Sequence, residues 1–216
     1  MKIKICGMKY PQNIQDISDF FPDYLGFIFY ENSKRFVLGD NLTVFSDYFL
    51  KETIRAQKVG VFVNEPIKNV IHLATTFDMN LLQLHGDESP EYCEQLHYLG
   101  FPIIKAFGIH EQFDFAVLDE YADVCDYFLF DTKAKEYGGT GKHFDWNLLK
   151  QYKLPNPIFL SGGLELDDIT TIHDLIKDIP IHALDFNSKL ENDFGLKDIA
   201  NSKAVIEAVH STFLNK

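Results

Sequence analysis

The chain has 216 residues, of which 46% are hydrophobic and 14% aromatic, so it can bury a substantial core. This length suits one large α/β domain better than two small ones, and we expect a single domain over residues 1–216. The formal net charge of −12, without a long run of Lys or Arg, argues against nucleic acid or an anionic membrane as the partner. A small anionic ligand is still compatible, because helix N-termini and single cations can bind it locally.

Cysteine usage and the N-terminal residues indicate a reducing compartment. Cys6, Cys93 and Cys125 are odd in number and far apart, without CxxC or metal-ligand spacing. The opening residues, MKIKICGMK, contain no apolar stretch of signal-peptide length, and no segment reaches the ~18 apolar residues of a membrane span. We therefore expect a cytoplasmic protein, in which Cys93 and Cys125 are small buried side chains.

Short apolar runs alternate with amphipathic segments along the whole chain. Residues 2–7 (KIKICG) form the first predicted strand, and the segment from Pro11 to Phe20 forms the first predicted helix, with proline at its start. The further predicted strands cover residues 24–29, 58–63, 81–84, 102–107, 127–130, 157–160 and 181–186. The further predicted helices cover 41–51, 66–77, a segment opened by Ser89, 111–121, a segment from Asp145, 167–176 and 197–213.

Eight strands, each followed by a helix, imply a parallel sheet with right-handed crossovers. Eight such units in one chain of this length predict a single (β/α)₈ TIM barrel with short loops. A doubly wound open sheet is the structural alternative. It usually has about five or six strands and carries its phosphate-binding glycines after the first of them, where this chain has only Gly7. The barrel is therefore preferred.

In such a barrel, chemistry is carried by residues at the C-terminal ends of the strands. In chain order these ends supply Cys6, Arg35, Asn64, His85, residues 105–107, Asp131, residues 161–163 and residues 185–188. The set contains a thiol, a guanidinium, an imidazole and two carboxylates. Asp131 draws attention because a buried apolar run delivers it to a loop with Gly138, Gly139 and Gly141. The plainer alternative for Asp131 is a solvated aspartate in a surface turn.

Several short motifs occur in an order that spans nearly the whole chain. They are KICG (4–7), GFIF (26–29) followed by Ser33 and Arg35, VGVFVN (59–64), LQLHG (82–86), FDT with GGTGKHFDW (130–146), FLSGGL (159–164) and ALDFNSKLE (183–191). Together they resemble the phosphoribosylanthranilate isomerase family of tryptophan biosynthesis. Three positions depart from the family pattern: Lys9 replaces a common threonine, Lys34 a proline and Lys189 a glycine.

The resemblance implies a cofactor-free and metal-free Amadori rearrangement of a phosphosugar, N-(5-phosphoribosyl)anthranilate. The family pattern places the general base on Cys6 and the general acid on Asp131. A thiol with a pKa of ~8.5 then needs positive potential nearby, and a carboxyl near ~3.9 needs burial or negative charge to hold its proton at neutral pH. The alternative for Cys6 is a small buried side chain, which its position at a strand end disfavours.

The resemblance also assigns contacts to the two anionic ends of the substrate. Arg35 matches the residue that pairs with the anthranilate carboxylate, for which a guanidinium fork is well suited. The phosphate is expected on backbone amides at the start of a short extra helix after the eighth strand. The residues expected to supply these amides are Gly162, Gly163, Ser188 and Lys189.

Three further residues or segments follow from the same comparison with the family. Asp185 is expected to contact the hydroxyls of the opened sugar, or else to be an internal carboxylate paired with Lys4 or Lys105. His85 makes either a structural hydrogen bond or a substrate contact. The loop from Gly138 to Lys142 is expected to close over the mouth as a flap, and its spacing does not match a nucleotide P-loop.

Three other functions compete with this interpretation. A histidine-pathway isomerase uses carboxylates at both catalytic positions, whereas this chain has Cys6. Indole-glycerol-phosphate synthase needs an early catalytic lysine and an N-terminal extension, whereas this chain starts directly with the first strand. A barrel that only binds a sugar phosphate is disfavoured because both Cys6 and Asp131 are present. We expect a monomer.

Overall fold

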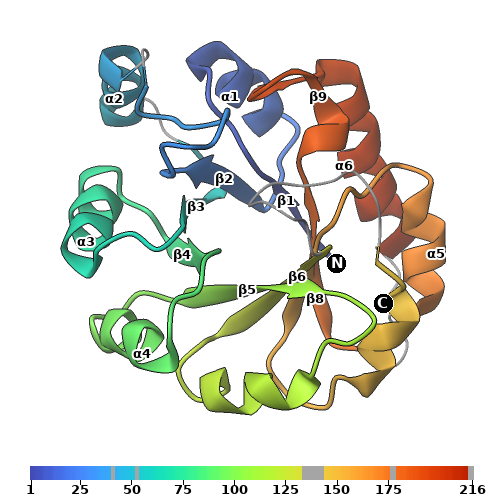
Figure 1. The fold of residues 1–216 in the computed structure, drawn as a ribbon. Helices are drawn as coiled ribbons and strands as arrows, with labels where there is room; N and C mark the ends of the chain where they lie inside the picture. The colour runs from blue at the N-terminus through green and yellow to red at the C-terminus, as the bar shows by residue number, and fades with distance from the viewer. Residues whose placement is uncertain (40–41, 52–53, 133–143, 176–178, 214–216) are drawn as a thin grey trace.

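The computed structural model describes residues 1–39, 42–51, 54–132, 144–175 and 179–213. Eight parallel strands close into a barrel in the order β1 to β8, and the helices surround it (Figure 1). The strands are β1 Lys2–Ile5, β2 Tyr24–Ile28, β3 Gln57–Phe62, β4 Leu81–Leu84, β5 Ile103–Ile109, β6 Tyr127–Thr132, β7 Ile158–Leu160 and β8 Ile181–Phe186. The predicted (β/α)₈ barrel is confirmed.

Six α-helices and two longer 3₁₀ helices cover the barrel in the described part of the chain. The α-helices are α1 Pro11–Ser18, α2 Leu42–Lys51, α3 Ile67–Thr76, α4 Pro90–Tyr98, α5 Asp168–Leu175 and α6 Ile199–Phe213. The two 3₁₀ helices are η1 Phe115–Tyr121 and η2 Trp146–Gln151. No helix among the described residues is long and apolar enough to cross a membrane.

The two 3₁₀ helices correct predicted α-helices at 111–121 and from Asp145. Strand β5 continues to Ile109, two residues beyond the predicted end, which shortens the chain left for the crossover. A 3₁₀ helix rises further per residue than an α-helix and so spans the gap with fewer residues. The side chains of Asp114 and Asp145 cap η1 and η2 by accepting hydrogen bonds from the backbone N–H groups of Ala116 and Asn147.

A second difference from the prediction follows β8. A short 3₁₀ helix, η3 Ser188–Leu190, leads into a hairpin of β9 Glu191–Asp193 and β10 Leu196–Lys197. The last helix therefore begins at Ile199, not at the predicted Lys197, whose side chain is buried. The short extra helix expected after the eighth strand is present as η3.

The barrel interior changes from apolar to polar along the strands. Eight buried residues form one apolar layer: Tyr24, Val59, Leu81, Ile104, Ala106, Leu129, Phe159 and Ala183. Side chains alternate between the two faces of a strand, so residues two positions later point into the barrel again. On four strands that next position is polar, and it supplies Gln83, Asp131, Ser161 and Asp185. The strand pattern thus places polar groups at the C-terminal mouth.

Candidate active site

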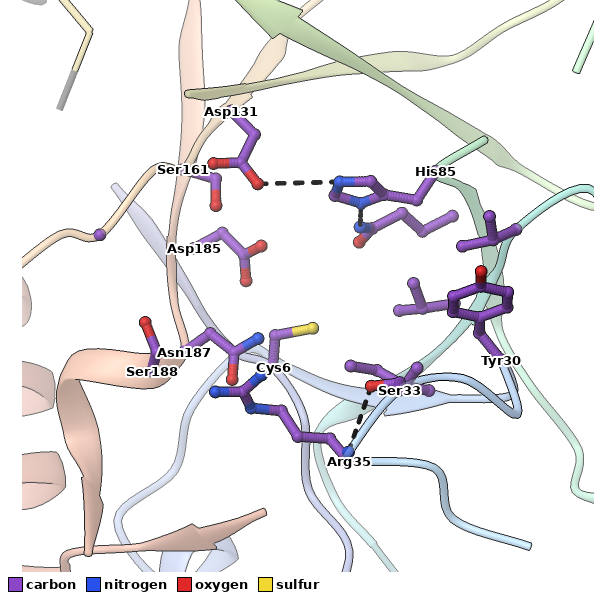
Figure 2. Close-up of a pocket in the computed structure, with 15 residues that line it drawn as sticks. Cys6, Tyr30, Ser33, Arg35, His85, Asp131, Ser161, Asp185, Asn187 and Ser188 are labelled. Atoms are coloured by element: carbon purple, nitrogen blue, oxygen red, sulfur yellow. Dashed lines mark hydrogen bonds and ion pairs between the residues drawn. The ribbon is translucent and has the colours of Figure 1, made fainter. Parts of the chain in front are cut away.

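A pocket opens at this mouth, with about 760 Å³ of free space that includes its opening to solvent. Seven of the nine residues predicted for the site line it, together with the polar layer of the barrel (Figure 2). These seven are Cys6, Arg35, His85, Asp131, Gly163, Asp185 and Ser188. The other two, Gly162 and Lys189, do not line the pocket.

Gly162 and Lys189 have other contacts. Gly162 adopts a φ of +105°, and a Cβ there would lie 2.5 Å from Thr132 Oγ1, so only glycine allows β7 to pack this closely on the end of β6. The Lys189 ammonium forms an ion pair with Glu165, and both side chains are partly exposed. The Lys189 side chain is therefore directed toward a surface partner, outside the pocket.

Cys6 follows β1 and is buried, with 4% of its surface exposed. Its backbone N–H donates to Phe186 O at 2.8 Å, which fixes the residue between β1 and β8. A Cβ on Gly26 of β2 would lie 2.7 Å from Cys6 Sγ, so this glycine makes room for the thiol. Burial raises the pKa of the Cys6 thiol above its ordinary value, while Lys4 and Lys197 oppose the shift. The positive potential that a thiolate requires is present, but burial outweighs it.

Asp185 is paired with Lys4 and also faces the pocket. The Lys4 ammonium lies 2.9 Å from Asp185 Oδ1, and both side chains are almost wholly buried. Burial alone would lower the pKa of Lys4, but Asp185 and Cys6 raise it above its ordinary value. Lys4 is therefore a fixed positive charge beneath the thiol. Lys105, the other partner considered for Asp185, instead contacts Glu88.

Asp131 lies near the end of β6 and has no comparable cation beside it among the described residues. Its Oδ1 accepts a hydrogen bond from the backbone N–H of Thr132 at 2.7 Å, and its Oδ2 lies 3.7 Å from His85 Nε2. Burial raises the pKa of Asp131 to about 6, with Asp185 adding to the shift. This carboxyl can therefore carry a proton close to neutral pH, as a general acid must.

His85 lies directly after β4, where its Nδ1 contacts Gln83 Nε2 at 2.7 Å. Burial, together with the nearby cations Lys105 and Lys4, lowers the pKa of His85 to about 4. The imidazole is therefore neutral in the physiological range. His85 makes a structural hydrogen bond and also lines the pocket, so its predicted contact with the substrate stays a prediction.

Arg35 forms an ion pair with Glu191, a carboxylate that was not predicted as part of the site. Its Nε lies 2.8 Å from Glu191 Oε1, and its Nη2 lies 2.6 Å from Glu191 Oε2. Lys197, which is fully buried, donates to the same Glu191 Oε1 at 2.8 Å. Burial would raise the pKa of Glu191, but these two cations lower it below its ordinary range. Glu191 occupies the Nε side of the guanidinium, which leaves the Nη1 side directed elsewhere.

The β9–β10 hairpin supplies both Glu191 and Lys197, and glycines are required at its turn and next to Arg35. Gly7 has a φ of +75°, and a Cβ there would meet Asn187 Oδ1 at 2.6 Å and Arg35 Cδ at 2.7 Å. Gly195, at the turn, has a φ of +79°. Glu191 and Lys197 were not predicted as site residues. The one sequence signal for them was that Glu191 ends the motif ALDFNSKLE.

The flap predicted from Gly138 to Lys142 lies outside the described residues. Among the described residues, no three His, Cys, Asp or Glu side chains are arranged so that they could hold a metal ion. All three cysteines are free thiols and buried, and Cys93 and Cys125 belong to the core as predicted.

A closed (β/α)₈ barrel with a thiol, a proton-carrying carboxyl and an anchored guanidinium in one mouth defines an enzyme of the barrel class. The sequence profile described as N-(5'phosphoribosyl)anthranilate (PRA) isomerase matches residues 3–208. The chain belongs to this family, whose members are aldose–ketose isomerases of tryptophan biosynthesis, and the resemblance inferred from the motifs is confirmed.

Individual relatives agree with this assignment. The N-(5'-phosphoribosyl)anthranilate isomerase of Parabacteroides distasonis is 42% identical over 97% of this chain and 93% of its own length. The Phocaeicola vulgatus enzyme of the same name is 39% identical over 100% and 97%. The crystal structure of phosphoribosyl anthranilate isomerase from Thermotoga maritima is 30% identical, with a TM-score of 0.84 over 98% of this chain and 99% of that one. Another structure of the enzyme, in complex with reduced 1-(o-carboxyphenylamino)-1-deoxyribulose 5-phosphate, has 26% identity and a TM-score of 0.79 over 98% and 99%.

Proposed function

We propose that this chain converts N-(5-phosphoribosyl)anthranilate into 1-(2-carboxyphenylamino)-1-deoxyribulose 5-phosphate, with Asp131 as general acid and Cys6 as general base. The observation that carries the proposal is the pair formed by these two groups in one pocket: a carboxyl with a pKa of about 6 and a thiol beside a fixed cation. The complex of a relative with the reduced form of this product supports the choice of ligand.

In the first step, Asp131 delivers its proton to the ring oxygen of the ribose. The C1–O bond breaks, and the nitrogen lone pair forms an iminium with C1. Burial keeps a useful fraction of Asp131 protonated, and no cation contacts its carboxyl oxygens among the described residues. An acid whose pKa is close to the working pH transfers its proton most effectively.

In the second step, Cys6 removes the proton from C2, and the electrons neutralise the iminium to give an enolamine that tautomerises to the ketone. Burial disfavours the thiolate of Cys6, but the iminium adds a positive charge next to the sulfur, in addition to Lys4. An opposite charge within a few ångströms lowers the pKa of a thiol. Ring opening thus creates the field that the base needs.

Binding of the two anionic ends completes the proposal. The Nη1 side of Arg35, opposite the edge held by Glu191, suits the anthranilate carboxylate. Backbone amides of Gly162, Gly163, Ser188 and Lys189, on the loop after β7 and on η3, are proposed to bind the phosphate. The Lys189 ammonium adds nothing to this site while it pairs with Glu165.

Asp185 is proposed to contact the sugar hydroxyls. Lys4 occupies its Oδ1, so Oδ2 is the oxygen proposed for this contact. No cofactor or metal enters the scheme, because every proton moves between the substrate and a side chain.

Cellular context adds three proposals. The free, buried cysteines support a cytoplasmic location, since exported proteins usually pair their thiols. We also propose that residues 1–216 form one catalytic domain and act as a monomer. Sedimentation analysis of the purified chain measures the last point directly.

The deciding experiment follows the fluorescence of the anthranilate group during incubation with N-(5-phosphoribosyl)anthranilate. We expect a change whose rate is proportional to the protein concentration and which is absent with Asp131→Asn. Saturable binding without turnover would refute the proposal and favour a barrel that only binds sugar phosphates.

A further inference from the structure

Gln83 and His85 form a linked pair of side chains at the end of β4. Gln83 points into the barrel and is 1% exposed, so its amide has little freedom to move. His85 follows two residues later and lines the same pocket. The 2.7 Å contact joins Gln83 Nε2 to His85 Nδ1. The mechanism proposed above uses neither side chain.

This contact determines which ring nitrogen of His85 carries the proton. The amide nitrogen of glutamine can only donate a hydrogen bond, so His85 Nδ1 must accept it. In a neutral imidazole the proton then resides on Nε2. His85 Nε2 lies 3.7 Å from Asp131 Oδ2, so the N–H is directed at the proposed general acid (Figure 2).

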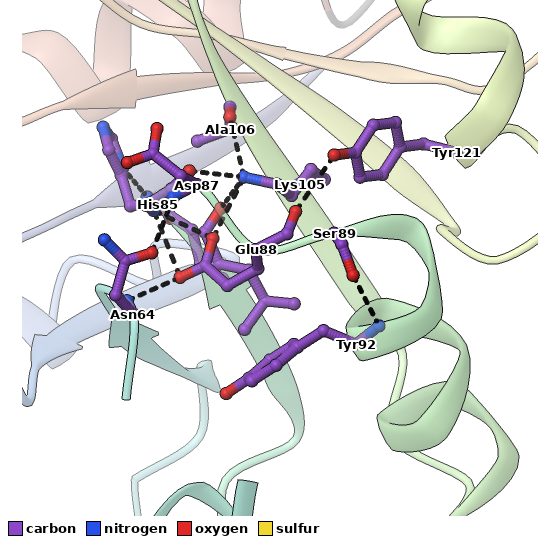
Figure 3. A network of polar contacts seen from close by, with 12 residues as sticks. Asn64, His85, Asp87, Glu88, Ser89, Tyr92, Lys105, Ala106 and Tyr121 are labelled. Atoms are coloured by element: carbon purple, nitrogen blue, oxygen red, sulfur yellow. Dashed lines mark hydrogen bonds and ion pairs between the residues drawn. The ribbon is translucent and has the colours of Figure 1, made fainter. Parts of the chain in front are cut away.

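A buried network holds the backbone immediately after His85 (Figure 3). The Lys105 ammonium donates to Gly86 O at 2.7 Å and to Glu88 Oε2 at 3.0 Å. Glu88 in turn accepts from the backbone N–H of Gly86 at 2.9 Å and from that of Asn64 at 2.8 Å. The imidazole is therefore anchored through its backbone and through its ring.

The charged groups around His85 oppose its protonation. Lys105 from β5 and Lys4 from β1 are the cations near it, and Asp131 from β6 is the acid that it faces. With burial, the two cations lower the pKa of His85 to about 4. An imidazolium at this position would favour ionised Asp131 and so remove the proton that ring opening needs.

We propose that Gln83 is a positioning residue of the isomerase, which holds His85 as the neutral Nε2–H tautomer facing Asp131. When Asp131 gives its proton to the ring oxygen it becomes a carboxylate, and His85 Nε2–H then donates a hydrogen bond to it. His85 keeps its own proton throughout. The 3.7 Å separation shortens as the charge develops, since catalytic hydrogen bonds often tighten only during reaction. This inference rests on the proposed role of Asp131.

The first test is spectroscopic and does not depend on turnover. In protein labelled with ¹⁵N-histidine, the shifts of the two ring nitrogens report which one is protonated. His85→Asn identifies the His85 signals among those of the eight histidines. We expect protonated Nε2 and bare Nδ1 from about pH 5 to pH 8. Gln83→Glu should instead move a proton to Nδ1, because a carboxylate only accepts. A protonated Nδ1 in the unmodified protein would overturn the proposal. This result would be found if the Gln83 amide were turned so that its oxygen faced His85.

The second test is a kinetic cycle of Gln83→Leu, His85→Ala and the double variant. Loss of a hydrogen bond to a developing charge should reduce kcat roughly 10- to 100-fold in Gln83→Leu, with KM nearly unchanged. If Gln83 acts only through His85, Gln83→Leu has no further effect once His85 is alanine. Independent, additive losses would overturn the proposal.

Asn156→Leu is the matched control for loss of a buried amide. The Asn156 amide donates to Ala122 O and Cys125 O, both at 2.9 Å, and its Oδ1, like Gln83 Oε1, is buried without a partner among the described residues. This variant should lose stability while kcat and the His85 shifts stay unchanged. An inactive unmodified protein with the expected tautomer would refute the proposed function but not the orientation of His85.

Discussion

Asp131→Asn should stabilise the protein at neutral pH while it abolishes activity. The Asp131 side chain is 17% exposed and lacks a close cationic partner among the described residues, so its ionised form is disfavoured in the folded state. Asparagine keeps the size of the side chain and can still accept the hydrogen bond from Thr132 N. The substitution therefore removes a buried charge and little else.

The expected gain follows from the pKa. An unfolded aspartate titrates near ~3.9, whereas Asp131 titrates at about 6 in the folded protein, so folding raises its pKa. A raised pKa favours the folded state below the unfolded value, and this contribution is lost as pH rises through the folded value. At pH 7 the free energy of unfolding is therefore lower than at acidic pH by on the order of 2–3 kcal/mol, since one pKa unit corresponds to ~1.4 kcal/mol.

Urea unfolding at about pH 7 and about pH 4 measures this difference. We expect Asp131→Asn to raise the free energy of unfolding at the higher pH and to leave it unchanged at the lower one. The contrasting variant is Asp185→Asn, which breaks the buried pair with Lys4 and should cost roughly 3–5 kcal/mol. A destabilised Asp131→Asn at pH 7, with the same loss at pH 4, would show that this carboxyl is stabilised as an anion and refute the argument.

The remaining predictions concern catalysis and binding. Asp131→Asn and Cys6→Ser should each lower kcat by at least ~10²-fold, but only the Cys6 variant should accumulate an open-chain iminium that borohydride traps. Trapping in both variants, or in Asp131→Asn alone, would contradict the assignment of Asp131 as acid and Cys6 as base. Glu191→Gln should raise KM roughly 10-fold with kcat nearly unchanged, because Arg35 loses a charge-assisted partner that fixes its guanidinium. Steady-state kinetics of this variant, measured together with Arg35→Ala, checks the prediction. A fall in kcat without a change in KM would exclude a binding role for Glu191. Lys189→Gly should leave the affinity for the reduced product analogue unchanged at low salt, since the Lys189 ammonium has a surface partner. Calorimetry measures this affinity, and weaker binding would show that the Lys189 ammonium contacts the phosphate.

The barrel and the position of its mouth could be predicted because their signals are local. Runs such as residues 127–130 are buried on both faces, and each ends in a residue unlike ordinary turn residues. The alternation from Leu81 to Gln83 was equally readable and indicates a polar side chain inside the barrel.

The electrostatic partners could not be predicted in the same way. Arg35 and Glu191 are 156 residues apart, and Lys4 and Asp185 are 181 apart. Only closure of the barrel brings β1 beside β8 and the hairpin after β8 beside the loop after β2. The 3₁₀ helix η1 escaped prediction because it depends on where β5 ends, and the register with β6 extends that strand to Ile109.

Closure of the barrel also gives the two aspartates of the pocket different neighbours. Asp185 lies on β8, whose register with β1 places it opposite Lys4, and the Lys4 ammonium opposes the rise in the pKa of Asp185 that burial causes. Asp131 lies on β6, opposite Gly108 of β5, where the neighbouring strand supplies no side chain at all. Burial raises the pKa of Asp131 to about 6, while the hydrogen bond from Thr132 N–H and the charge of Lys4 oppose the shift without cancelling it. Different surroundings are how enzymes give two groups of the same kind different roles. In this chain the difference arises from strand register, so a substitution that placed a cation at Gly108 should lower the pKa of Asp131 and the rate of ring opening together.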